Sequence, residues 1–209
     1  MKFATLDFNL LQHLHKEEII VATNFLFIRD RFVECYFWMM GLYFELQYAI
    51  ARTFMTKIIS LTSILDDIYD AYGSCEELEI FTKAIHKWDI NCIDQLPDYM
   101  KLWYSKTLKV YKDMEDLMSK EGKPYRVQYA IEAMKQQSQV FFIEAKWFHG
   151  NYISTKEEYM PIALLSCGYL QLAIASFVGM EDGITKETFN WAANEPKIIR
   201  ASNIICRLM

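Results

Sequence analysis

Residues 51–74 read ARTFMTKIISLTSILDDIYDAYGS, and the spacing of their apolar side chains decides the fold class. Apolar residues recur every three or four positions, which is the period of one face of an α-helix. These positions are Phe54, Ile58, Leu61 and Leu65. The pair Gly73-Ser74 favours a helix end and offers a serine to cap the next helix. The stretch therefore predicts a long amphipathic helix with several aspartates near its end.

The helical period continues along the chain, and no segment shows the alternation typical of a β-strand. We expect helices at about 32–44, 48–72, 76–88, 98–120, 125–149, 156–178 and 186–192, with another starting near Pro196. Glycine and proline are sparse, and no flexible linker divides the chain. Because the connections are short, consecutive helices should pack antiparallel around one centre. The sequence predicts an all-α antiparallel helical array.

Composition and charge narrow the classes of function. The chain has 209 residues, of which 53% are hydrophobic and 15% aromatic, enough to fill one sizeable core. Its formal net charge of −5 provides no excess of basic side chains to neutralise a nucleic-acid backbone, so general nucleic-acid binding is excluded. An anionic substrate would have to be bound locally, by a few cations or by a metal.

The cysteines indicate the compartment in which the protein is expected. The five cysteines form no CxxC pair, which indicates free thiols in a reducing compartment, and we expect a cytoplasmic protein.

The sequence predicts neither a targeting segment nor a membrane span. Residues 1–18 contain charges and no continuous apolar core, so we expect no targeting segment. Residues 159–180 are uncharged over roughly the 20 positions that cross a bilayer. Because Pro161 and Gly168 interrupt them, we expect a buried core helix broken near Gly168 and no membrane span.

The chemical signal lies in Asp66, Asp67 and Asp70. Asp66 and Asp70 are four residues apart and share one helix face with an apolar stripe, so both should stand at the mouth of an apolar cavity. Like charges at this spacing cost a helix a few tenths of a kcal/mol, which a bound cation would offset. Oxygen ligands without nearby histidine or cysteine suit Mg²⁺, which is commonly held together with substrate phosphates. The motif alone fits a solvated acidic helix end about equally well.

The surrounding sequence favours the metal site. The segments FIRDRFVECYFWMMGLYFE at 27–45 and SILDDIYDAYGSCEELEIFTKAIHKWD at 63–89 resemble the class I terpene synthase domain of plants. The resemblance continues through segments at 92–104, 141–160 and 194–209 and covers nearly the whole chain. Within that family, the chain is most similar to angiosperm sesquiterpene synthases of the cadinene and germacrene type. The resemblance implies the class I terpenoid synthase fold.

The resemblance also implies roles for individual residues. Asp66, Asp67 and Asp70 match the aspartate-rich metal motif of the family, with Asp66 and Asp70 as direct ligands of Mg²⁺, or alternatively of Mn²⁺. A cation held there would bind the diphosphate of a prenyl substrate.

Further roles follow for three arginines and a tryptophan. Arg29 and Arg31 match the Arg-x-Arg pair that holds the departing diphosphate, and Arg207 matches an arginine that contacts it. Guanidinium groups suit this task because their N–H forks fit phosphate oxygens. Trp38 matches the tryptophan that faces the carbocation, which an indole face attracts by about 0.5–2 kcal/mol.

The chain departs from the family pattern in several respects, of which one concerns the metal site directly. The second metal motif of relatives would begin at or just after Met209. We therefore expect residues 1–209 to be a partial metal-binding domain, without the N-terminal helical domain and the C-terminal helices of relatives.

The leading hypothesis is a Mg²⁺-dependent sesquiterpene synthase, a carbon–oxygen lyase. It would ionise farnesyl diphosphate and fold the cation in an apolar aromatic pocket that excludes water. One alternative is a truncated, catalytically silent relative. A less favoured alternative is a prenyl diphosphate synthase, which carries a second aspartate motif and an Arg-Arg pair that this sequence lacks.

Overall fold

The computed structural model describes residues 31–180 and 183–208, and every regular element in these ranges is helical. The α-helices are α2 (Phe32–Leu42), α3 (Ala49–Asp67), α4 (Cys75–Lys87), α5 (Asp98–Lys120), α6 (Tyr125–His149), α7 (Lys156–Ser166), α8 (Tyr169–Ser176), α9 (Lys186–Ala193) and α10 (Lys197–Leu208). Short 3₁₀ segments occupy Leu46–Tyr48 and Ile90–Gln95, and a π-helical turn occupies Ile68–Tyr72. The predicted all-α fold is confirmed.

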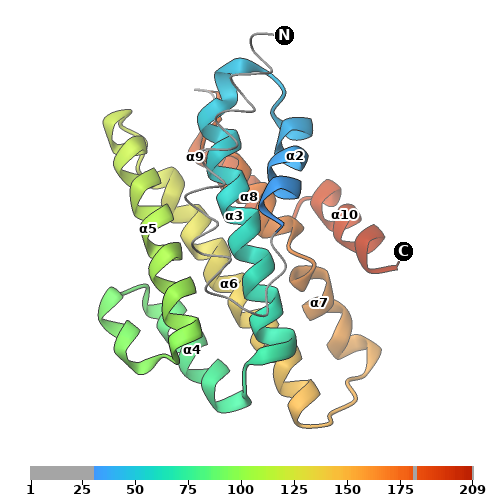
Figure 1. Ribbon diagram of the computed structural model, residues 1–209. Coiled ribbons are helices and arrows are strands. Elements are labelled where there is room, and N and C mark those ends of the chain that lie inside the picture. Colours follow the sequence, from blue (N-terminus) through green and yellow to red (C-terminus); the bar gives the residue numbers. More distant parts are fainter. Residues whose placement is uncertain (1–30, 181–182, 209) are drawn as a thin grey trace.

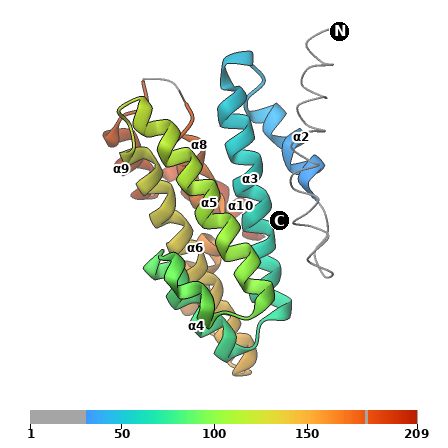
Figure 2. The ribbon, with the colours of Figure 1, turned by 60° about the vertical axis from the view of Figure 1, so that its left-hand side comes forward.

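The long helices α3 and α6 form the centre of the array (Figure 1). Helix α6 packs against α4, α5, α7, α8 and α9, whereas α3 packs against α2, α5 and α8. Figure 2 shows α5 in front of α6, with α2 and α3 to one side. One main apolar cluster runs through these helices and buries side chains from α2 to α10. The array therefore has a single principal core, with α3 crossing it.

Both ends of α3 are tied to neighbouring segments by buried polar contacts. Near its start, the buried guanidinium of Arg52 donates to the carbonyl oxygens of Tyr43 at 2.5 Å and Glu45 at 2.6 Å. Toward its end, the fully buried indole of Trp103 on α5 donates from Nε1 to the carbonyl oxygen of Leu61 at 2.8 Å. The end of α3 that carries the aspartates is therefore held against the core.

The predicted helix ends agree closely with the structure. Helices α5 and α6 have the predicted bounds of 98–120 and 125–149. Capping boxes start α4 and α7: the hydroxyl of Ser74 accepts from the N–H of Glu77, and that of Thr155 accepts from the N–H of Glu158. In each box the glutamate also accepts from the backbone N–H of its capping residue. Local chemistry thus fixes where these helices begin.

The predicted helix 156–178 is two helices, with the break at the expected glycine. Cys167 and Gly168 separate α7 from α8, and Gly168 adopts φ +81°, a conformation that glycine reaches without steric penalty. Lys156–Ser176 is long and apolar enough to span a bilayer by length and composition alone. Half of its most apolar window is buried, and both helices pack on α6. The expected break at Gly168 is therefore confirmed, whereas the expected core position holds for α8 and not for the start of α7, whose residues 156–159 are exposed.

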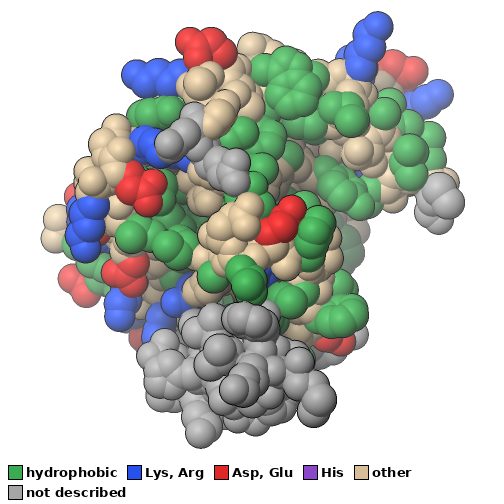
Figure 3. All heavy atoms as spheres, turned by 90° about the horizontal axis from the view of Figure 1, so that it is seen from above, with side chains coloured by type: hydrophobic (Ala, Val, Ile, Leu, Met, Phe, Trp, Pro, Cys, Tyr) green, Lys and Arg blue, Asp and Glu red, His purple; other side chains and the backbone are tan. Residues whose placement is uncertain are grey.

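One end of the array carries exposed apolar side chains. Viewed from above, Figure 3 shows hydrophobic side chains over much of this face, with many of the charged ones toward its margins. The exposed large apolar residues of the described chain include Leu46, Ile50, Trp191 and Ile198. Apolar surface of this kind favours association with other protein surfaces.

Replacing the buried tryptophan that anchors α3 should destabilise the fold. Trp103→Phe removes the hydrogen bond to Leu61 and leaves unfilled volume, so the free energy of unfolding should fall by about 1–3 kcal/mol. Urea denaturation measures this change. The matched control is Trp191→Phe, since Trp191 is 50% exposed, and it should change stability by less than about 0.5 kcal/mol. Equal effects in the two variants would contradict the assigned anchoring role.

Candidate functional site

A cavity of about 710 Å³ lies between α3, α6, the α7–α8 turn and α10. Its walls are mainly apolar and aromatic, with contributions from Ile59, Phe141, Trp147, Phe148, Tyr159 and Leu172. Charged side chains from the end of α3 and the turn that follows it, from α6 and from α10 also line it. The cavity therefore combines apolar walls with a local group of charges, as ligand sites commonly do.

Two of the three predicted aspartates line this cavity. Asp66 lies near the end of α3, and Asp70 lies in the π-helical turn that follows, whereas Asp67 is not among the lining residues. Tyr69 fixes the turn, because its buried ring packs beside Phe81 and its hydroxyl hydrogen-bonds the Thr82 hydroxyl at 2.6 Å. The core thus determines where the Asp70 carboxylate stands.

The aspartates repel one another in a partly desolvated setting. Desolvation by the surrounding protein raises the pKa of Asp66 to about 6, with further contributions from the charges of Asp70, Asp67 and Glu144. Desolvation and the charge of Asp67 raise the pKa of Asp70, while Arg207 opposes the shift. In the absence of a cation, the site therefore disfavours ionised carboxylates.

Glu144 is a third carboxylate in the cavity, and it belongs to none of the motifs predicted from the sequence. It lies on α6 in the lining face that also carries Phe141, Ala145 and Phe148. Desolvation raises its pKa, while its hydrogen bond with Ser166 and the charge of Arg207 oppose that shift. The feature of the sequence that could have indicated Glu144 is that it is a single carboxylate on an otherwise apolar face of the predicted helix 125–149.

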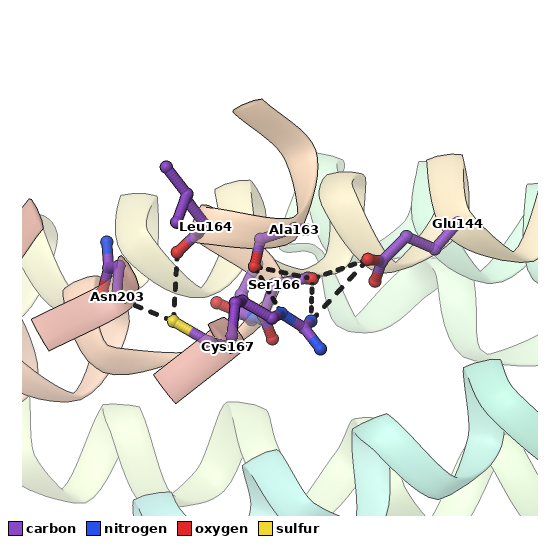
Figure 4. Close-up of polar contacts among 8 residues, drawn as sticks. Glu144, Ala163, Leu164, Ser166, Cys167 and Asn203 are labelled. Atoms are coloured by element: carbon purple, nitrogen blue, oxygen red, sulfur yellow. Dashed lines mark hydrogen bonds and ion pairs between the residues drawn. The ribbon is translucent and has the colours of Figure 1, made fainter. Parts of the chain in front are cut away.

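Arg207 enters the cavity wall from α10 and docks on the end of α7. Its Nε donates to the carbonyl oxygen of Ala163 at 2.6 Å, and its Nη2 donates to the hydroxyl of Ser166. That hydroxyl donates in turn to Glu144 Oε1 at 2.8 Å (Figure 4). The same glutamate oxygen lies 3.7 Å from Arg207 Nη2. Carbonyls at a helix C-terminus favour a cation, so this end of α7 is a suitable support for the guanidinium.

The remaining predicted site residues lie elsewhere or outside the described ranges. Arg29 lies outside the residues that the structure describes. Arg31 directly precedes α2, and Trp38 lies on α2 with 49% of its surface exposed. Neither is among the residues that line the cavity, so the roles of Arg29, Arg31 and Trp38 stay predictions.

The donor set fits a magnesium ion that shares its ligands with a substrate. Within the described ranges, no group of three or more His, Cys, Asp or Glu side chains could hold a metal alone. Mg²⁺ needs fewer protein ligands, because it is usually bound through one or two carboxylates, waters and substrate phosphates. Asp66, Asp70 and Glu144 face a single guanidinium, that of Arg207, so the lining carries excess negative charge that a cation would neutralise.

Comparison with curated proteins identifies plant relatives that match the whole chain. The chain is 53% identical over its full length to (−)-germacrene D synthase of Vitis vinifera, and it covers 39% of that protein. It is 50% identical over its full length to (+)-delta-cadinene synthase isozyme XC14 of Gossypium arboreum, and it covers 40% of that protein. The chain thus spans about two fifths of the length of these relatives.

Solved structures and a family profile also match nearly the whole chain. The crystal structure of isoprene synthase from grey poplar, with three Mg²⁺ ions and dimethylallyl-S-thiolodiphosphate, matches 96% of the chain with a TM-score of 0.82 and 31% identity. The chain covers 40% of that structure. The profile described as terpene synthase family, metal binding domain, matches residues 17–209. The chain therefore belongs to the terpene synthase family, and nearly all of it corresponds to that family's metal-binding domain.

Proposed function

We propose that this chain forms the diphosphate-binding half of a Mg²⁺-dependent sesquiterpene synthase that acts on farnesyl diphosphate in the cytosol. The observation that carries the proposal is that Asp66, Asp70 and Arg207 line one cavity whose other walls are largely apolar. The sesquiterpene products in the names of the two plant relatives support this substrate class. The Mg²⁺ ions and thiolodiphosphate bound to the poplar enzyme support the ion and the leaving group.

Charge explains why a diphosphate would enter this cavity only with a cation. Asp66, Asp70 and Glu144 together would repel an anionic substrate. Mg²⁺ bound by Asp66 and Asp70 would supply positive charge to the diphosphate oxygens as the leaving group departs. The raised carboxylate pKa values agree with such a site, because carboxylates that are destabilised by desolvation and by each other's charge gain most from a cation.

Arg207 would hold the diphosphate from the opposite wall. Its Nε and Nη2 contacts on α7 restrict the side chain before any ligand arrives. A guanidinium positioned in this way loses little conformational freedom on binding and stabilises charge that develops on phosphate oxygens. Arg207 therefore fits the role of a fixed diphosphate donor.

The apolar walls would protect the hydrocarbon part of the reaction. Ile59, Phe141, Phe148 and Leu172 present carbon surface to the cavity, and aromatic faces attract cations. Excluding water matters because water would capture a carbocation before it cyclises. The five cysteines are free thiols, which is typical of a reducing compartment and supports the proposed cytosolic location.

Binding of Mg²⁺ and pyrophosphate should depend on the two cavity aspartates. Together these ions should raise the melting temperature of the chain by mass action, and Asp66→Ala combined with Asp70→Ala should abolish the rise. Differential scanning fluorimetry measures the melting temperature of wild type and of the double variant with and without these ions. The matched control is Asp98→Ala with Asp116→Ala, because these aspartates lie on the exposed face of α5 and should leave the rise intact. An unchanged rise in the cavity double variant would remove Asp66 and Asp70 from the site.

The raised pKa of Asp66 predicts how stability depends on pH without metal. Because its folded pKa of about 6 exceeds the ordinary value of 3.8, this carboxyl contributes stability at low pH that is lost as pH rises through 6. The Asp66→Asn variant does not lose stability in this way, because its amide side chain does not ionise. Its free energy of unfolding relative to wild type should therefore increase between about pH 4 and about pH 7, as measured by urea denaturation in chelator. A difference that is the same at both pH values would show that Asp66 is not perturbed.

A further inference from the structure

Two thiols from different helices meet in the wall of the cavity, and the proposed function uses neither. Cys167 lies in the turn between α7 and α8, and Cys206 lies near the end of α10. Both are among the residues that line the cavity. The other three cysteines, Cys35, Cys75 and Cys92, are not part of this lining.

The contacts around these thiols fix how α10 meets the α7–α8 turn. The Cys167 thiol donates to the carbonyl oxygen of Leu164 at 3.0 Å and reaches Asn203 Oδ1 at 3.4 Å (Figure 4). Asn203, Cys206 and Arg207 are three and four residues apart, so they share one face of α10. Since Asn203 contacts Cys167 and Arg207 contacts Ser166, Cys206 lies between two contacts with the same turn.

The two thiols have different surroundings at the contact between α10 and the α7–α8 turn. Cys206 lies three residues after Asn203, which contacts the Cys167 sulfur, and directly before Arg207, which contacts Ser166, so both thiols lie at this contact. Cys206 is exposed, whereas Cys167 is partly buried, and desolvation raises the pKa of the Cys167 thiol. An oxidant in solution would therefore reach Cys206 first, and Cys167 would be the neighbouring thiol that reacts next.

We propose that Cys167 and Cys206 form a dithiol modification site in the cavity wall, which a peroxide converts to a disulfide. The Cys206 sulfur attacks one peroxide oxygen and breaks the O–O bond, giving a sulfenic acid and one water. The Cys167 sulfur then displaces the sulfenic hydroxyl as a second water and forms the S–S bond. Overall, two thiols are oxidised by two electrons, and one hydrogen peroxide is reduced to two waters.

The disulfide would join α10 covalently to the turn that separates α7 from α8. It would hold Arg207 and Ser166 near each other, because both flank the joined residues. It would also stabilise the fold, since cross-linking positions 167 and 206 restricts the unfolded chain. This inference concerns thiol chemistry alone and stands independently of the proposed enzymatic function.

Peptide mapping after mild oxidation tests the proposal directly. The full chain is treated with hydrogen peroxide, its remaining thiols are alkylated, and the protein is digested with trypsin. Mass spectrometry should find the Cys167 and Cys206 peptides linked, and dithiothreitol should separate them. Cys75→Ser is the matched control, because Cys75 lies on α4 away from this lining, and it should leave the link intact.

Two conservative variants distinguish a disulfide between Cys167 and Cys206 from independent oxidation of each thiol. In Cys167→Ser, the Cys206 sulfenic acid should accumulate and be trapped by a 1,3-diketone, whereas wild type should give much less trapped product. Oxidation should also raise the melting temperature of wild type but not of Cys167→Ser or Cys206→Ser. Equal trapping in wild type and Cys167→Ser, or a link between Cys206 and another cysteine, would overturn the proposal.

Discussion

The carboxylates of Asp66 and Asp70 repel each other in the wall of a largely apolar cavity, and the burial of α3 prevents them from separating. The indole of Trp103 holds α3 at Leu61, five residues before the first aspartate, and Tyr69 fixes the turn that carries the second. Packing energy spread over the core thus maintains a local arrangement that is electrostatically unfavourable. A site kept in this state is ready for a cation, because no part of the fold needs to move to create it.

The break between α7 and α8 has a complementary effect on the opposite wall. A continuous helix would satisfy its own carbonyls, but Gly168 ends α7 by adopting a left-handed conformation. The end of α7 then accepts the guanidinium of Arg207 through Ala163 and Ser166. The break at this glycine therefore supports a positive charge in the same cavity lining as the aspartates, and it also brings Cys167 against Asn203 of α10.

Much of this architecture could be predicted from the sequence because it depends on local rules. The bounds of α5 and α6 follow from apolar periodicity, and the start of α4 follows from the capping pair Ser74 and Glu77. Glu144 could not be placed in the same way, because its role depends on how closely α6 approaches α7 and α10. The π-helical turn was also missed, since spacing arguments assume the regular 3.6-residue period, and this turn is set by tertiary contacts of Tyr69.

The apolar walls of the cavity affect the charge state of the aspartates in its lining. Phe141 and its apolar neighbours line the same space as Asp66 and Asp70, and desolvation is the main cause of the raised carboxylate pKa values. A drier cavity would protect a cationic hydrocarbon better, but it would also increase the cost of leaving the carboxylates ionised without a counterion. Under the proposed function, the need for a metal beside Asp66 and Asp70 therefore grows as water is excluded from the cavity, so substitutions that open the walls to water should weaken both properties together.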